Sequence, residues 1–211
     1  MEDVLRLYAR PWSKTAPVVC FDERPVVLHD DARAGLPMKP GRVGQRDYEY
    51  VRKGTANIFC VVEPKSGKRL SYATPSRTGP EFAKAMAKLA RAYPCAKKIH
   101  VVMDNLNTHF RKSVVSHYGE KRGGLIWKRF VVHYTPKHAS WLNMAEMEAS
   151  LVSRECLGSR RLGSFDQLAA EVEAWRRAAV ASGRTIEWKF RVHDARRVFR
   201  YDGILTTPTG H

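Results

Sequence analysis

The sequence predicts an α/β fold in which helices cover both faces of a mixed five-stranded sheet. First, 44% of the 211 residues are hydrophobic, which is enough for one domain with its own core. Second, a turn at residues 64–67 joins two strand-like segments, which predicts an antiparallel hairpin. Third, strand-like and helical segments alternate from residue 78 onward, as they do where helices connect parallel strands. A sheet that contains both kinds of pairing is mixed.

The five expected strands are short runs of apolar or β-branched residues bounded by Pro, Gly or charged residues. In chain order they cover residues 17–22, 55–62, 69–74, 98–104 and 127–134. The first and the fourth each end in an aspartate. Between the first two strands, residues 30–54 are rich in Gly, Pro, Lys and Arg, which predicts a long basic surface loop.

Four helices are expected around these strands, at residues 78–93, 111–118, 140–157 and 164–179. Thr78 with Glu81 and Ser164 with Gln167 have the spacing of capping boxes. Ser140 is expected to cap the third helix. The last helix has apolar residues at alternating spacings of three and four, which is typical of an amphipathic helix.

The charge of the chain indicates a polyanionic partner. Lys and Arg number 37 against 21 Asp and Glu, a net charge of +16. Such an excess indicates what a protein binds rather than how it folds, and counterion release would favour binding to nucleic acid. No apolar run approaches the ~20 residues that a membrane span needs, and the N-terminus lacks a signal peptide, so we expect an intracellular protein with no membrane contact. The four cysteines are far apart, which gives no support to disulfides or a zinc ribbon.

Three acidic residues stand where strand ends and helix starts are expected to meet. Asp22 ends the first strand, Asp104 ends the fourth, and Glu146 lies near the start of the helix after the fifth. If the first and fourth strands are neighbours, the two aspartates lie side by side. Clustered carboxylates need a cation to stay ionised together, and oxygen ligands suit Mg²⁺ or Mn²⁺. Two such ions about 4 Å apart can activate a hydroxyl and stabilise the leaving oxygen of a phosphodiester.

Each of these acids also has a purely structural interpretation. An aspartate at a strand end is often a turn former, and a glutamate in a first helical turn is favoured by the helix dipole. Glu148 is the rival for the third position, but it lies roughly 200° round the helix from Glu146. Glu23 is expected on the face of its strand opposite to Asp22. Trp141 is expected to be a core residue rather than a platform for base stacking.

Three sequence blocks resemble those of the mariner-like DDE transposases, with the bacterial insertion-sequence branch as the nearest match. The blocks are VVCFDE at residues 18–23, VVMDNLNTH at 101–109 and YTPKHASWLNMAE at 134–146. The resemblance extends from about residue 17 to about residue 201. It implies a ribonuclease H-like fold, a metal-binding triad of Asp22, Asp104 and Glu146, and two Mg²⁺ or Mn²⁺ ions.

Two second-tier residues follow from the middle block, Asn105 and His109. A histidine near a metal can orient a phosphate or relay a proton, and a packing role is the alternative. The chain departs from the family pattern at two places. The 41 residues between Asp104 and Glu146 exceed the usual spacing, and the glycine-rich stretch at 119–124 is expected to hold the extra residues. Met144 stands where the family usually has proline.

The resemblance implies metal-dependent DNA cleavage and strand transfer, with transposon ends and target DNA as partners. Two alternatives stay open: a ribonuclease H-like nuclease that does not join strands, and a decayed DNA-binding remnant without activity. The basic loop, including Lys39, Arg42 and Arg46, is expected to contact DNA. The expected location is the bacterial cytoplasm, at the nucleoid.

Full-length members of the family carry an N-terminal helix-turn-helix region, but only sixteen residues precede the first expected strand. We therefore expect residues 1–16 to be a linker or the remnant of a missing DNA-binding region. Residues 17–201 are expected to form the DDE catalytic domain, and residues 202–211 a flexible tail. The resemblance also allows a homodimer and a separate chain that supplies the DNA-binding region.

Overall fold

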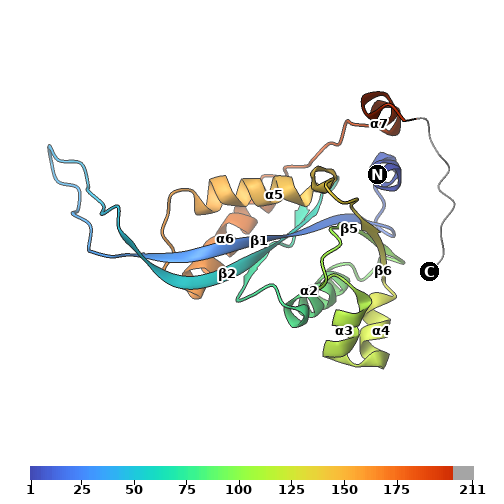
Figure 1. The fold of residues 1–211 in the computed structure, drawn as a ribbon, viewed down its shortest axis with the longest axis horizontal. Coiled ribbons are helices and arrows are strands. Elements are labelled where there is room, and N and C mark those ends of the chain that lie inside the picture. Colours follow the sequence, from blue (N-terminus) through green and yellow to red (C-terminus); the bar gives the residue numbers. More distant parts are fainter. Residues whose placement is uncertain (202–211) are drawn as a thin grey trace.

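A six-stranded mixed sheet forms the centre of the fold (Figure 1). The computed structural model describes residues 1–201, and the expected tail at 202–211 lies outside the described residues. The strand order is β3-β2-β1-β5-β6, and β4 pairs with β2 beside β3. The strands are β1 Val18–Asp31, β2 Tyr50–Glu63, β3 Lys68–Arg69, β4 Tyr72–Thr74, β5 Ile99–Met103 and β6 Phe130–Tyr134.

The pairing directions confirm the mixed sheet expected from the sequence. β1 pairs antiparallel with β2, and β2 pairs antiparallel with β3 and β4. β1 and β6 both pair in parallel with β5. The sheet has six strands rather than five because the expected strand at 69–74 is divided in two. At the break, the Ser71 hydroxyl accepts a hydrogen bond from the Val61 amide at 3.0 Å, so a side chain replaces the backbone partner.

Helices cover both faces of the sheet, as expected. The helices at residues 79–92, 111–118 and 120–127 pack on one face, and those at residues 2–9, 145–151, 165–181 and 192–199 pack on the other. The α-helices are α1 Glu2–Ala9, α2 Gly79–Ala92, α3 Arg111–Tyr118, α4 Glu120–Trp127, α5 Ala145–Leu151, α6 Phe165–Ala181 and α7 Val192–Phe199. A 3₁₀ turn at Ser140–Leu142 precedes α5, and a π-helical segment at Val152–Leu157 follows it.

The N-terminal segment is folded, which corrects the expectation of a linker for this part of residues 1–16. Residues Val4, Leu5, Leu7 and Tyr8 of α1 are buried against the sheet. The Tyr8 hydroxyl donates a hydrogen bond to the Leu142 carbonyl at 2.7 Å. Their spacing places these four side chains on one face of a helix, a pattern that a single short helix hardly reveals in sequence.

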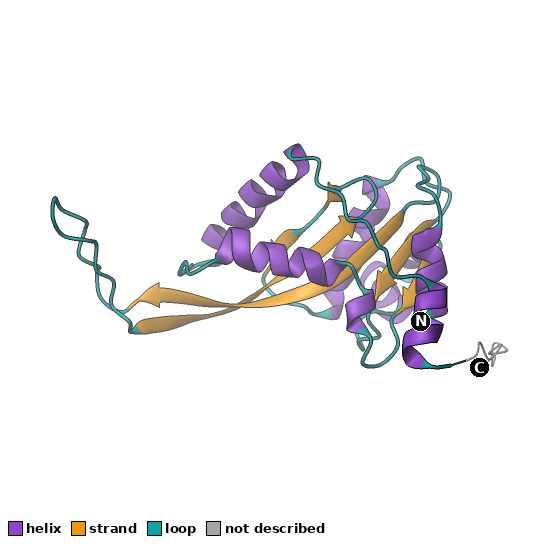
Figure 2. Cartoon of the chain, turned by 90° about the horizontal axis from the view of Figure 1, so that it is seen from above, coloured by secondary structure: helices purple, strands orange, loops and turns teal. Residues whose placement is uncertain are grey.

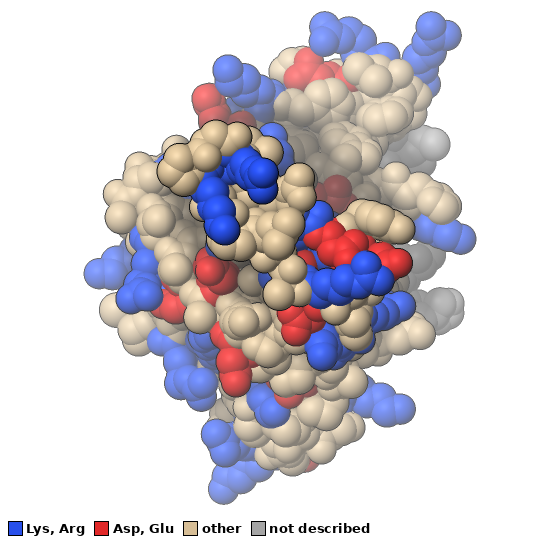
Figure 3. Space-filling model, turned by 90° about the vertical axis from the view of Figure 1, so that its left-hand side faces the viewer, with Lys and Arg blue, Asp and Glu red and all other residues tan. Residues whose placement is uncertain are grey.

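The first strand is much longer than expected. It continues beyond Asp22 to Asp31 and pairs with β2 as far as Tyr50, so the basic loop shortens to residues 32–49. The outer part of this ribbon is largely exposed, which explains the error, because backbone pairing does not require an apolar sequence. Figure 2 shows the two strands leaving the body of the sheet and ending in the loop. Figure 3 looks onto this tip, where basic and acidic side chains are intermixed.

The helix ends differ from the expected capping in three places. Thr78 is the N-cap of α2 but its side chain caps no amide. Ser164 accepts a hydrogen bond from the Gln167 amide at 3.2 Å, while the Gln167 side chain accepts one from Gly163 instead of completing the box. Ser140 begins a 3₁₀ turn instead of capping the long helix that was expected there, and α5 starts only at Ala145.

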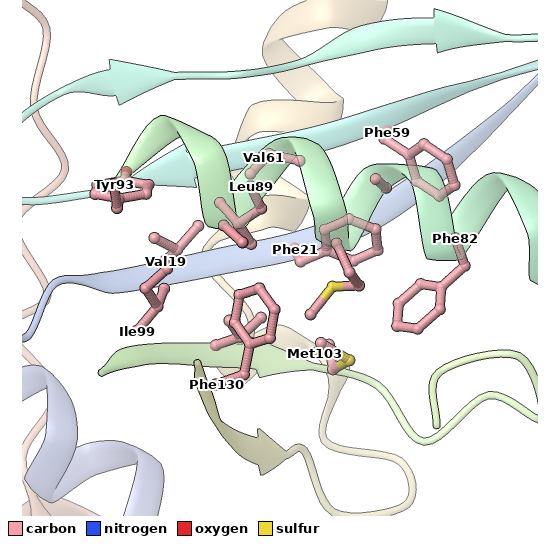
Figure 4. Close-up of a cluster of buried hydrophobic side chains, with 14 of the residues drawn as sticks. Val19, Phe21, Phe59, Val61, Phe82, Leu89, Tyr93, Ile99, Met103 and Phe130 are labelled. Carbon is pink, nitrogen blue, oxygen red and sulfur yellow. The ribbon is translucent and has the colours of Figure 1, made fainter. Parts of the chain in front are cut away.

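The main core lies between the sheet and α2 (Figure 4). Phe21 of β1 meets Phe59 of β2 and Phe82 of α2, with ring centroids 5.1 and 5.7 Å away. Val19 and Met103 are fully buried in the same cluster. This core fixes β1 and β5 together on one face, while the opposite face of β1 remains available to α5.

The glycine-rich stretch at 119–124 contains a second helix rather than only a loop. Gly119, with φ of 78°, ends α3, and α4 follows immediately. Gly123 is buried against α3, and a Cβ on it would lie 2.8 Å from the Val115 Cα. A Cβ on Gly124 would meet only the ends of two flexible side chains, Arg111 at 3.6 Å and Glu120 at 3.9 Å.

We therefore expect opposite effects from two neighbouring substitutions. Gly123→Ala should lower the free energy of unfolding by about 1–3 kcal/mol, because backbone atoms of α3 would have to move. Gly124→Ala should raise it by up to about 1 kcal/mol, because alanine favours the helix. Urea unfolding of both variants measures the difference. Equal stabilisation by both would contradict the close packing of α3 on α4.

Candidate active site

Asp22 lies in the interior of β1, on the face that α5 covers. Because β1 continues to Asp31, the expected placement at a strand end is wrong. The Asp22 Oδ1 accepts a hydrogen bond from the Glu23 amide at 2.8 Å. The side chain is half-buried and lines an open groove together with Glu146. Its neighbours in the strand, Phe21 and Glu23, are directed to the opposite face.

Asp104 lies beside Asp22 through the parallel pairing of β5 with β1. Cys20 of β1 is in register with Val102 of β5, and each aspartate stands two residues further along its strand direction. Asp104 follows Met103, the last residue of β5. The sequence-based condition that the first and fourth expected strands be neighbours is therefore met.

Glu146 is brought to the same place by Asn143. The Asn143 side-chain amide donates a hydrogen bond to the Phe21 carbonyl at 2.8 Å, and its Oδ1 accepts one from the Ala145 amide at 3.2 Å. The start of α5 is thereby attached to β1 next to Asp22. Asn143 is a positioning residue that the sequence reasoning did not single out, although it lies in the most specific of the three blocks.

The three carboxylates interact electrostatically. Burial, followed by the negative charges of Asp104, Glu146 and Glu23, raises the pKa of Asp22 to about 6, against the effect of the Glu23 amide. Within residues 1–201, no three or more His, Cys, Asp or Glu side chains lie close enough together to hold a metal ion as they stand. Carboxylates are the hard oxygen ligands that a divalent cation prefers, and Asp22 and Glu146 line an open groove with Asp104 beside Asp22.

His109 links Asp104 to Glu23 inside the core. Its Nδ1 lies 2.7 Å from the Asp104 Oδ1, and its Nε2 lies 3.1 Å from the Glu23 Oε1. The ring is fully buried between Phe21 and Phe82. Burial lowers the pKa of His109, but its hydrogen bonds to the two carboxylates and their charges outweigh that effect and raise the pKa to about 9. A buried imidazolium can hold Asp104 in place but cannot reach a phosphate itself.

Other residues singled out from the sequence lie further from the acids. The Asn105 side chain is exposed in the loop after β5. Trp141 is 40% exposed and packs against Trp188, Phe190 and Phe199 in a surface cluster, so it is only partly a core residue.

Glu148 takes part in the core instead of the groove. Its carboxylate and the Arg69 guanidinium are both fully buried, with Nε and Oε2 3.1 Å apart. Burial raises the pKa of Glu148, while the charge and hydrogen bonds of Arg69 and Ser71 oppose that rise. This ion pair joins α5 to β3, so Glu148 is committed to a structural contact, and of the two glutamates only Glu146 lines the groove.

The basic loop lies at the far end of the β1–β2 ribbon, away from the acids (Figure 1). Arg46 is paired with Asp31 at 2.8 Å, so part of its charge is neutralised within the loop. Lys39 and Arg42 are exposed, and their backbones pair with each other in an isolated antiparallel β-bridge.

The family model for the DDE superfamily endonucleases matches residues 17–169. The chain belongs to this family. The match includes Asp22, Asp104 and Glu146, so this DDE endonuclease carries acids on β1, after β5 and on α5. Among residues 1–201, no helix is both long enough and apolar enough to cross a membrane.

The fold of this DDE endonuclease is similar to that of a mariner transposase in solved structures. A crystal structure of the Mos1 mariner paired end complex with Mn is similar with a TM-score of 0.56 and 16% identity, covering 84% of this chain and 52% of that one. A Mos1 transposase paired-end complex with left transposon end gives a TM-score of 0.43 and 15% identity, covering 89% and 61%. The first likeness confirms the ribonuclease H-like fold. The chain spans only about half to three fifths of these proteins, and no curated protein matches it.

The two glutamates of α5 should respond differently to substitution. Glu148→Gln should lower the free energy of unfolding by about 3–5 kcal/mol, because it leaves Arg69 buried without a counter-charge. Glu146→Gln should leave stability unchanged or slightly raised, because it removes a repulsion in the groove. Urea unfolding at neutral pH and without metal compares them. A larger loss from Glu146→Gln would contradict the assigned positions.

Proposed function

We propose that this DDE endonuclease is a transposase catalytic domain of the bacterial insertion-sequence type, which cleaves DNA and joins the 3′ end to a target. The observation that carries the proposal is that Asp22 and Glu146 line one groove, with Asp104 beside Asp22 across the β1–β5 pairing, in a chain of net charge +16. The similarity of the fold to that of the Mos1 mariner paired end complex with Mn supports it.

Asp22, Asp104 and Glu146 would hold two Mg²⁺ or Mn²⁺ ions. Bound there, the ions supply Lewis-acid activation of a hydroxyl and stabilisation of the leaving oxygen. The chain's own residues provide the framework: β1 and β5 hold the aspartates side by side, and Asn143 fixes Glu146 against β1. His109 keeps Asp104 oriented from the core, with Glu23 behind it.

The remaining parts of the proposal concern partners. DNA, as transposon ends and target, is the proposed substrate, and Lys39 and Arg42 at the ribbon tip are proposed contacts to its backbone. We also propose residues 17–201 as the catalytic domain, with α1 packed onto it. A homodimer and a separate DNA-binding chain are compatible partners for recognition of the ends.

Asp104→Asn tests the catalytic role. Mn²⁺-dependent nicking of plasmid DNA should fall at least about 100-fold, because weaker metal binding removes several kcal/mol of transition-state stabilisation. DNA affinity without metal should persist. Asp166→Asn is the matched control, since Asp166 is an exposed aspartate on α6 with no ion pair among the described residues. Nicking by Asp104→Asn at the wild-type rate would refute the proposal.

A pre-cleaved end separates transfer from hydrolysis. An oligonucleotide duplex with a free 3′-hydroxyl at a transposon end should become joined to a target plasmid in the presence of Mn²⁺. Nicking without any joined product would indicate the nuclease alternative. Absence of both activities in the wild-type chain, with DNA binding retained, would indicate a non-catalytic remnant.

His109→Asn tests the positioning role. The Mn²⁺ affinity should fall about 10–100-fold, because residues that orient metal ligands typically contribute that much. Glu23→Gln should weaken Mn²⁺ binding in the same direction. Mn²⁺ titration followed by electron paramagnetic resonance measures this independently of activity. Lower thermal stability with unchanged Mn²⁺ affinity would reduce His109 to a packing residue.

A further inference from the structure

A groove of about 680 Å³ extends from the acids between β1 and the helix that carries Glu146. Beyond Asp22 and Glu146, its walls are Glu23 and Arg24 of β1 on one side and residues that follow Glu146 on the other, with the Glu23 carboxylate buried against His109. In Figure 1, β1 and α5 run side by side away from the sheet towards the ribbon. The groove therefore leads from the acids in the direction of the hairpin.

The helical wall of the groove is made of small and hydroxyl-bearing side chains. Ala149, Ser150 and Ser153 lie three, four and seven positions after Glu146, which is the spacing of one helical face. Ser153 donates its hydroxyl to the Ala149 carbonyl at 2.8 Å, whereas Ser150 is exposed and free to donate. No bulky side chain on this face obstructs an extended chain of phosphates.

Two arginines without counter-ions stand beyond the acids. Arg24 follows Asp22 by two residues and so shares its face of β1. Arg154 lies in the π-helical segment after α5, a kind of distortion that often accompanies functional sites. Both line the groove, both are exposed, and neither forms an ion pair or side-chain hydrogen bond within residues 1–201. By contrast, Arg46 and Arg161 are paired with Asp31.

The two cations are staggered along the groove. Two residues of strand separate Arg24 from Asp22 by about 7 Å, and eight residues of helix separate Arg154 from Glu146 by roughly 12 Å. A polyanion that approaches three carboxylates is repelled unless cations stand next to them. Free guanidinium groups at successive distances from the acids match successive phosphates of one strand.

We propose that Arg24, Ser150 and Arg154 bind the phosphates of one DNA strand where it leaves the acids towards the ribbon. The proposal rests on DNA being the substrate of this groove and adds where the strand runs. Arg24 and Ser150 hold the phosphate nearer to the acids, and Arg154 holds the next along the groove. The contacts are to the backbone and are independent of base sequence.

The salt dependence of DNA binding tests this assignment. The full chain is titrated with a fluorescent DNA duplex in EDTA, from about 50 to about 200 mM salt, so that no metal and no cleavage enter the measurement. Each of Arg24→Ala and Arg154→Ala should lower the slope of log affinity against log salt by about 0.9, and the double variant by about 1.8. The double variant with Arg24→Lys and Arg154→Lys should keep most of the wild-type slope, because lysine keeps the charge.

Arg91→Ala is the matched control. Arg91 is an exposed arginine in the last turn of α2, on the opposite face of the sheet, with no ion pair among the described residues. The Arg91→Ala substitution removes the same charge but should leave the slope of log affinity against log salt unchanged. A double Arg24 and Arg154 variant with the wild-type slope would overturn the proposal, as would an equal decrease in Arg91→Ala.

The outcome is separable from that of the proposed function. If the arginine variants lose the slope but the wild-type protein never nicks DNA, the strand path is supported and the catalytic proposal is refuted. An unchanged slope in a wild type that nicks normally would refute the strand path alone. Thermal melting of each variant shows whether it is folded under the conditions of the titration. If an alanine variant has a lowered melting temperature, the corresponding lysine variant is compared with the wild type instead.

Discussion

The parallel pairing of β1 with β5 is the constraint on which the candidate site depends. Its register places Asp22 of β1 beside Asp104, which directly follows β5, although their carboxylates repel. The pairing is held from one side by the aromatic core around Phe21. Asn143 then uses the carbonyl of the same Phe21 to attach the helix that bears Glu146. One residue therefore connects the stability of the core with the geometry of the three acids.

Charge is distributed so that a basic molecule keeps an acidic centre. The acids of the groove lie next to each other at an energetic cost that burial increases, and a divalent cation would remove it. His109 provides a fixed positive charge from inside the protein, between Asp104 and Glu23. On the outside, Arg24 and Arg154, which have no ion pair among residues 1–201, would offset the repulsion for an approaching phosphate. Under the proposed function, cations at different depths around the same carboxylates would support binding and catalysis.

Much of this arrangement could be predicted from the sequence, and the failures have identifiable causes. The apolar runs that form β2 and β5, and the helical spacing in α6, follow directly from periodicity. The exposed half of β1 was missed because its pairing rests on backbone hydrogen bonds, and α1 because eight residues carry little periodic signal. Residue type alone did not distinguish Glu146 from Glu148. The structure separates their positions through Arg69, a buried cation on a strand that only tertiary contact brings to α5.

An anomalous difference map from crystals of the full chain soaked in Mn²⁺ tests the central claim most directly. The account predicts a Mn²⁺ peak bridging the carboxylates of Asp22 and Asp104, with Glu146 turned towards the metal from α5. Two Mn²⁺ peaks in contact with these three residues would confirm the two-ion site in full. The absence of any peak at saturating Mn²⁺, or a peak held by other residues with Asp22 and Asp104 uncoordinated, would contradict the account.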